Sequence, residues 1–144
     1  MKKQTAILIG AGAALAATAA IAGYVQPQIV DVDLTTNTAL GDQVTARYSK
    51  NNIELIGCGI RKTIVAPGTY FHFGFCQATD RGGDAITCFT EDEGLLDTIS
   101  SSADYGFVTF SWVPGATPDD PAECNRIGFS NQSFYLPKKL DSNE

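Results

Sequence analysis

The sequence predicts a mainly β domain, which we expect to be an antiparallel β-sandwich or small barrel with one short helix at about 91–100 and two disulfides. Three observations support this fold class. Short runs rich in β-branched and aromatic residues recur along the chain. Turn signals such as Pro67-Gly68 separate these runs. Four cysteines follow a segment typical of an export signal.

The first 22 residues have the composition of a secretory signal. Two lysines follow the initial Met, and an uncharged, alanine-rich run then extends to Ala22. The run ends in Ala20-Ile21-Ala22, the small-x-small pattern that signal peptidase cleaves. We therefore expect cleavage after Ala22 and export through the general secretory pathway, to the periplasm or the extracellular space.

The alternative for this segment is an uncleaved membrane anchor. No charged residue lies between Lys3 and Asp31, so the apolar stretch is long enough to cross a bilayer. Alanine and glycine drive membrane insertion less than leucine or isoleucine, which favours the cleaved signal. No cysteine near the segment offers a thiol for a lipid anchor, and no arginine pair precedes it.

The remaining chain has the size of one domain and is acidic. Removal of 22 residues from 144 leaves 122, which we divide into a β-rich domain at 23–137 and a polar tail at 138–144. Loss of the two leader lysines leaves 8 basic against 16 acidic residues, a net charge of −8. This charge disfavours nucleic acids and anionic membrane surfaces as partners.

The cysteine count of four predicts two disulfides in an exported chain. The cysteines are separated by 17, 11 and 35 residues, so no C-x-x-C pair indicates a zinc site. Folding about Gly82 would place Cys76 opposite Cys88. This symmetry favours Cys76–Cys88 together with Cys58–Cys124, although spacing alone leaves the other two pairings open.

The first half of the domain contains three expected strands. An alternating run at 29–34 predicts the first, 44–48 the second and 53–60 the third. The segment between the first two strands, 35–42, is polar and is expected to be a loop. Gly57 and Gly59 flank Cys58 and indicate a bulge or a close backbone approach in the third strand.

An aromatic strand at 70–76 is the best candidate for the centre of the core. Phe71, Phe73 and Phe75 share one face by the period-two rule, and we expect that face to be buried. The glycine-containing segment 80–84 is typical of a hairpin loop. We therefore expect 85–89 to return beside the aromatic strand.

The second half begins with the short helix. Thr90 and Glu93 form a capping box before three apolar residues at helical spacing, which predicts a helix over 91–100. The β-rich runs at 105–112 and 123–130 predict two further strands, and 114–122, with three prolines, predicts a loop. Residues 134–136 would extend the last strand.

Few residues are candidates for chemistry. His72 is the single histidine and lies on the strand face opposite Phe71, Phe73 and Phe75, where we expect an ordinary surface imidazole. Trp112, Tyr105 and Tyr135, with Phe134, are candidates for an aromatic binding surface, with burial in the core as the alternative. The sequence contains no nucleophile elbow, metal-ligand spacing or cofactor-binding loop, so we predict no catalytic residue, metal or cofactor.

Four segments that contain or adjoin the cysteines and Trp112 resemble a group of small exported, cysteine-containing proteins of Gram-negative bacteria. The group has no assigned activity. The segments are 73–80, 88–90, 110–112 and 124–137, and the resemblance extends over about 53–139. The resemblance implies export and a β-rich fold, and it implies no catalytic residue.

These observations favour an exported, non-enzymatic module that binds a partner or builds a surface structure. The partner is an unidentified protein or surface, and oligomerisation through an edge strand at 105–112 is one route to assembly. Two alternatives stay open. One is a small envelope hydrolase or hydrolase inhibitor that uses His72 with a nearby Ser or Asp. The other is a carrier that holds a small ligand in an aromatic cavity between sheets.

Overall fold

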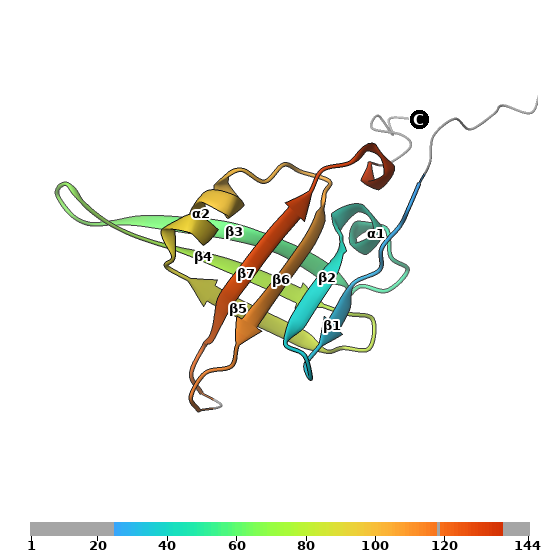
Figure 1. Ribbon diagram of the computed structural model, residues 1–144, viewed down its shortest axis with the longest axis horizontal. Coiled ribbons are helices and arrows are strands. Elements are labelled where there is room, and N and C mark those ends of the chain that lie inside the picture. Colours follow the sequence, from blue (N-terminus) through green and yellow to red (C-terminus); the bar gives the residue numbers. More distant parts are fainter. Residues whose placement is uncertain (1–24, 118, 137–144) are drawn as a thin grey trace, which may run out of the picture.

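The protein is built on a single seven-stranded sheet (Figure 1). The computed structural model describes residues 25–117 and 119–136. The predicted secretory signal at 1–22 and the polar tail at 138–144 lie outside the described residues. In chain order the elements are β1 (Asp31–Asp33), β2 (Thr38–Asp42), α1 (Gln43–Arg47), β3 (Leu55–Ala66), β4 (Thr69–Thr79), β5 (Ala85–Thr90), α2 (Glu93–Ser100), β6 (Phe107–Val113), β7 (Ala122–Ser130) and the 3-10 turn η1 (Ser133–Tyr135).

The strand order is β1-β2-β6-β7-β5-β4-β3, and the sheet is not closed. All neighbouring strands are antiparallel except β5 and β7, which pair in parallel through two residue pairs. The predicted mainly β class, with a short helix and two disulfides, is confirmed. The strands belong to one open, mixed sheet, in place of two separate sheets or a closed barrel.

The sheet folds over on itself at the junction between β7 and β5. Figure 1 shows β3, β4 and β5 (the back half) running across behind β1, β2, β6 and β7 (the front half). One core fills the space between the two halves, with Val108 and Phe110 of β6 and Cys76 and Ala78 of β4 in the same cluster. The packing therefore resembles that of a sandwich, although the two halves belong to one continuous sheet.

The predicted helix at 91–100 is present as α2, but its cap differs from the prediction. The Asp92 side chain accepts a hydrogen bond from the Leu95 N–H at 2.9 Å, and Asp92 is the N-cap residue. The Thr90 hydroxyl instead accepts from the Asp92 N–H at 3.1 Å. The predicted Thr90–Glu93 capping box is therefore wrong, and Thr90 positions the capping residue.

Helix α2 packs its buried Leu96 and Ile99 against β4 at Gly74. A Cβ atom at Gly74 would lie 2.7 Å from Ile99 Cδ1 and 3.0 Å from Leu96 Cδ2. The glycine is thus required for the close approach of the helix to the inner face of the back half.

Two local predictions before β3 are wrong. Residues 38–42, expected in a loop, form β2, and 44–48, expected in a strand, correspond to helix α1. The cause is Asp42, which is 1% exposed. Its carboxylate accepts hydrogen bonds from the N–H groups of Thr45 and Gln28, so it caps α1 and ties the preceding segment to β2.

The other strands are present with shifted ends. The aromatic hairpin is longer than predicted, because β3 and β4 continue past the last pair that β4 makes with β5, Gly74 with Thr90. Residues 61–73 therefore project from the sheet as an arm (Figure 1). The strand expected from residue 105 begins at Phe107, after Tyr105 with its φ of 64°. Residues 134–136 do not extend β7, and the 3-10 turn η1 forms there.

Candidate binding groove on the outer face of the sheet

The phenylalanines of β4 face outward, contrary to the prediction. The even-numbered residues Gly74, Cys76 and Ala78 are buried against the front half and α2. Phe71 and Phe73 project from the other face, with Phe71 44% exposed. Small side chains on the inner face leave room for α2, for the disulfides and for the opposite half, and the large rings therefore lie outside.

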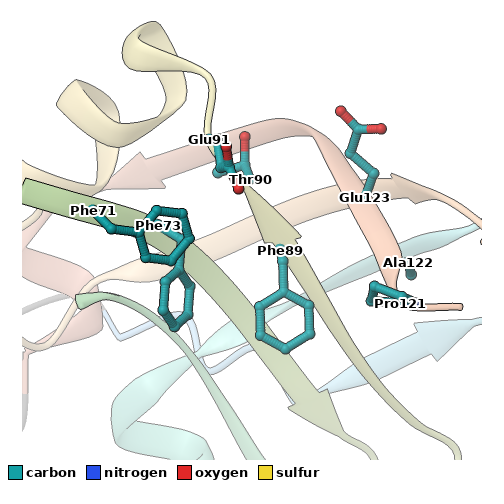
Figure 2. Close-up of a pocket in the computed structure, with 8 residues that line it drawn as sticks. All are labelled: Phe71, Phe73, Phe89, Thr90, Glu91, Pro121, Ala122 and Glu123. Carbon is teal, nitrogen blue, oxygen red and sulfur yellow. The ribbon is translucent and has the colours of Figure 1, made fainter. Parts of the chain in front are cut away.

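Three of the outer rings form a continuous aromatic surface. The Phe71 and Phe73 ring centroids are 5.8 Å apart, and those of Phe73 and Phe89 are 6.0 Å apart. Phe89 comes from the adjacent strand β5 and is 39% exposed. Figure 2 shows the rings of Phe73 and Phe89 projecting side by side from neighbouring strands. The three rings thus form one contiguous patch and not separate exposed side chains, and large contiguous apolar patches mark interaction sites.

This surface lines an open groove of about 700 Å³ on the outside of β4, β5 and the start of β7. Its lining residues are Phe71, Phe73, Phe89, Thr90, Glu91, Pro121, Ala122 and Glu123 (Figure 2). Register places Glu123 beside Phe89, and Glu91 follows β5 by one residue. Both carboxylates are exposed, and the lining includes no basic residue.

The side chains that line the groove indicate the class of ligand that it is suited to bind. Aromatic faces attract cations and apolar groups, and two carboxylates attract positive charge. The groove is thus suited to a segment that combines a guanidinium or ammonium group with apolar side chains. It has no arrangement of a nucleophile and a base.

The opposite border of the aromatic surface is basic. Arg61 of β3 is paired in register with Phe73, and its guanidinium lies 4.9 Å from the centroid of the Phe75 ring. Phe75 in turn covers Gly59, where a Cβ atom would lie 3.0 Å from the ring. The aromatic surface is therefore bordered by the carboxylates of the groove on the β5–β7 side of β4 and by a guanidinium on the β3 side.

The residues predicted to form a binding surface lie elsewhere. Trp112 is 4% exposed and packs in the core, with its ring 6.1 Å from that of Phe110. Tyr105 is exposed in the loop before β6, and Tyr135 stacks on Phe107 at 5.6 Å. Trp112 points into the core, so these residues do not form one surface.

His72 faces α2, on the side of β4 away from the groove. Its Nε2 lies 3.4 Å from a carboxylate oxygen of Glu93, in the first turn of the helix. Among the described residues, no hydrogen bond joins His72 to a serine or threonine hydroxyl. His72 thus lies between the arm and α2, where it contacts Glu93.

The preferred disulfide pairing is wrong: the bonds are Cys58–Cys76 and Cys88–Cys124. Cys76 is in register with Cys88, as the hairpin predicts, but it is also in register with Cys58 on its other side. In an antiparallel sheet, a residue points both of its backbone hydrogen-bonding groups toward one neighbouring strand. The Cα–Cα distance to its partner on the other neighbouring strand is therefore shorter. The Cα–Cα distance of 4.0 Å between Cys58 and Cys76 belongs to the narrow pair.

The strand expected at the edge is interior. β6 lies between β2 and β7 and pairs with both, so no free edge exists at 105–112. The long edge strand of the sheet is β3. Beyond residue 60, the sequence of β3 lacks the strong alternation of apolar and polar residues that is present in β6. Prediction from sequence missed the groove as well, because the small residues Gly74, Cys76 and Ala78, and not the phenylalanines, form the buried face of β4.

Three further findings complete the description. Within 25–117 and 119–136, no three histidine, cysteine or acidic residues gather into a group that could hold a metal ion. No helix in that part of the chain has the length and apolar character needed to cross a membrane. Comparison of the chain with family models, with curated proteins and with solved structures finds no match.

Proposed function

We propose that the protein is an exported, non-enzymatic binding module and that the groove at Phe71, Phe73 and Phe89 is its binding site. The observation that carries this proposal is the exposure of a continuous aromatic surface with two carboxylates at its border. The fold does not need these rings outside, because its core is filled by other residues. The cost of exposing them is accounted for if they contact a partner.

Two features support export into an oxidising compartment, the periplasm or the extracellular space. All four cysteines are in disulfides, and disulfides persist in such compartments and are rare in a reducing cytosol. The basic start and alanine-rich run of the first 22 residues are those of a secretory signal.

The proposed ligand is a cationic, apolar segment of a protein or of a surface structure. Negative charge at the groove attracts such a segment over a distance of about one Debye length, roughly 8 Å at physiological salt. The aromatic rings then supply the apolar contact and cation–π attraction, which anchor many interfaces.

The experiment is photo-crosslinking in the organism that carries the gene, with a benzophenone amino acid in place of Phe89. We expect covalent adducts at this position, and their loss when Glu91 and Glu123 are both changed to Lys. The control position is Tyr48, which is 69% exposed and follows α1, away from the groove. Absence of adducts at Phe89, or equal adducts at Tyr48, would contradict the proposal.

A further inference from the structure

A row of three residues across the outer face carries opposite charges at its two ends. Arg61 of β3 is paired in register with Phe73 of β4. Thr90 is paired with Gly74, so Glu91 lies beside Phe73 on the other side, where both residues line the groove. The row therefore runs from a cation through an exposed ring to an anion.

The hairpin of β3 and β4 carries only positive charge, whereas the groove is lined by carboxylates. From residue 55 to residue 79 the sequence contains Arg61 and Lys62 and no acidic residue, whereas all 16 acidic residues of the chain lie outside this hairpin. On the outer face, Arg61 lies beside Phe73 of β4, whose ring contacts the exposed Phe71 ring. This side of the face therefore combines a cation with apolar surface, which is what the groove is suited to bind.

This arrangement is self-complementary under a two-fold rotation about an axis that runs along β4. The rotation places β3 of one copy over the β5 side of the other, and the same contact recurs on the opposite side of the axis. Arg61 of each copy then lies over Glu91 of the other. Phe71 and Phe73 lie on the axis, where each ring meets its own counterpart.

We propose that the groove is occupied by a second copy of this chain, in a face-to-face homodimer held by Arg61–Glu91 contacts around the Phe71 and Phe73 rings. The inference rests on the proposed function of the groove as a binding site and names its partner. A charge pair of this kind fixes the orientation of the two copies, and the aromatic rings supply the buried apolar surface.

The test is sedimentation of the oxidised protein, expressed with its leader, over a wide concentration range. We expect a reversible dimer for the wild type. The variants Arg61→Glu and Glu91→Arg each place like charges in contact twice per dimer, and we expect each to weaken dimerisation by about tenfold or more. An equimolar mixture of the two variants restores both opposite-charge contacts and should form a heterodimer.

Lys62→Glu is the matched control. It makes the same change in net charge one residue away, but the Lys62 ammonium packs over the Tyr70 ring at 4.9 Å on the other face of the hairpin. We expect the dimer of this variant to match that of the wild type. Retained disulfides and an unchanged circular dichroism spectrum check that every variant is folded.

Four outcomes would overturn the inference: a wild type that stays monomeric, a mixture of the two variants that does not associate, an equal loss in Lys62→Glu, or adducts at position 89 with a different protein alone. The proposed function is tested separately, because adducts at position 89 with a different protein would support the groove while excluding the second copy. Absence of any adduct would contradict the groove itself.

Discussion

The two faces of the back half show that burial follows from what lies opposite a residue, and not from its size or hydrophobicity. The inner face of β4 carries Gly74, Cys76 and Ala78, which are small and fully covered. The outer face carries Phe71 and Phe73, which are larger and more apolar but have no layer over them. The inner face holds the fold together, and the outer face leaves aromatic rings partly open to solvent.

Replacement of one buried and one exposed phenylalanine by alanine tests this difference most strongly. Phe110 is fully buried between the halves, and Phe110→Ala should lower the free energy of unfolding by about 3–5 kcal/mol. Phe89→Ala removes an exposed ring and one aromatic pair, and should lower it by about 1 kcal/mol. Urea unfolding of the oxidised proteins measures both values, and similar losses would contradict the assignment of the two faces.

Removal of the disulfides tests the inner face alone. Loop-closure entropy predicts a loss of about 4 kcal/mol without Cys88–Cys124 and about 3 kcal/mol without Cys58–Cys76, because the sequence separations are 36 and 18. Paired Cys→Ser variants and urea unfolding measure the losses. Peptide mapping under non-reducing conditions checks the pairing directly, and a peptide linked through Cys76 and Cys88 would contradict the structure.

Addition of one methyl group distinguishes the covered position from an open one. Gly74→Ala would press on Ile99 and Leu96 and should cost about 1–3 kcal/mol. The matched control is Gly57→Ala on β3, where the nearest atom to an added Cβ, Nε2 of Gln43, is 3.8 Å away. Thermal unfolding should show a lower midpoint for the first variant than for the second, and equal midpoints would show that α2 does not depend on Gly74.

The smallest effect is expected at Asp33, the last residue of β1, whose carboxylate accepts hydrogen bonds from the turn that follows. Hydrogen bonds from the backbone N–H of Thr36 and then Thr35 lower the pKa of this carboxyl. Its contribution to stability is therefore complete above the ordinary Asp pKa of about 3.9 and is lost as the pH falls through the lower pKa of the folded state. Asp33→Asn should reduce the acid-side slope of stability against pH slightly and leave the groove unchanged.

Local signals in the sequence predict much of the fold. The hairpin 80–84 is correct because its glycines allow the turn, and Gly83 has a φ of 96°. The helix at 91–100 is correct because its apolar spacing matches the packing of Leu96 and Ile99. In both cases the residues that determine the element lie within the element.

The predictions are wrong where a contact between residues far apart in the sequence determines the local structure. Asp42 caps α1 only because its carboxylate is buried against the N–H of Gln28, which no local pattern in 38–48 reveals. Cys76 has an in-register neighbour on each side, and the sequence shows only the one across the hairpin turn. The outward position of the Phe71 and Phe73 rings follows from the placement of α2 and the front half. The groove was therefore not predictable from strand periodicity alone.

The disulfides of this fold join each cysteine to the next one along the chain, Cys58 to Cys76 and Cys88 to Cys124. A chain that enters an oxidising compartment with its N-terminus first presents its thiols in that same order. An oxidant that joins thiols as they emerge would then produce the native bonds directly, with no need for an isomerase. The nested arrangement, with Cys76–Cys88 inside Cys58–Cys124, would require the first thiol to wait for the last. The consecutive connectivity would thus allow the two bonds of an exported chain to form one after the other, in the order of its cysteines.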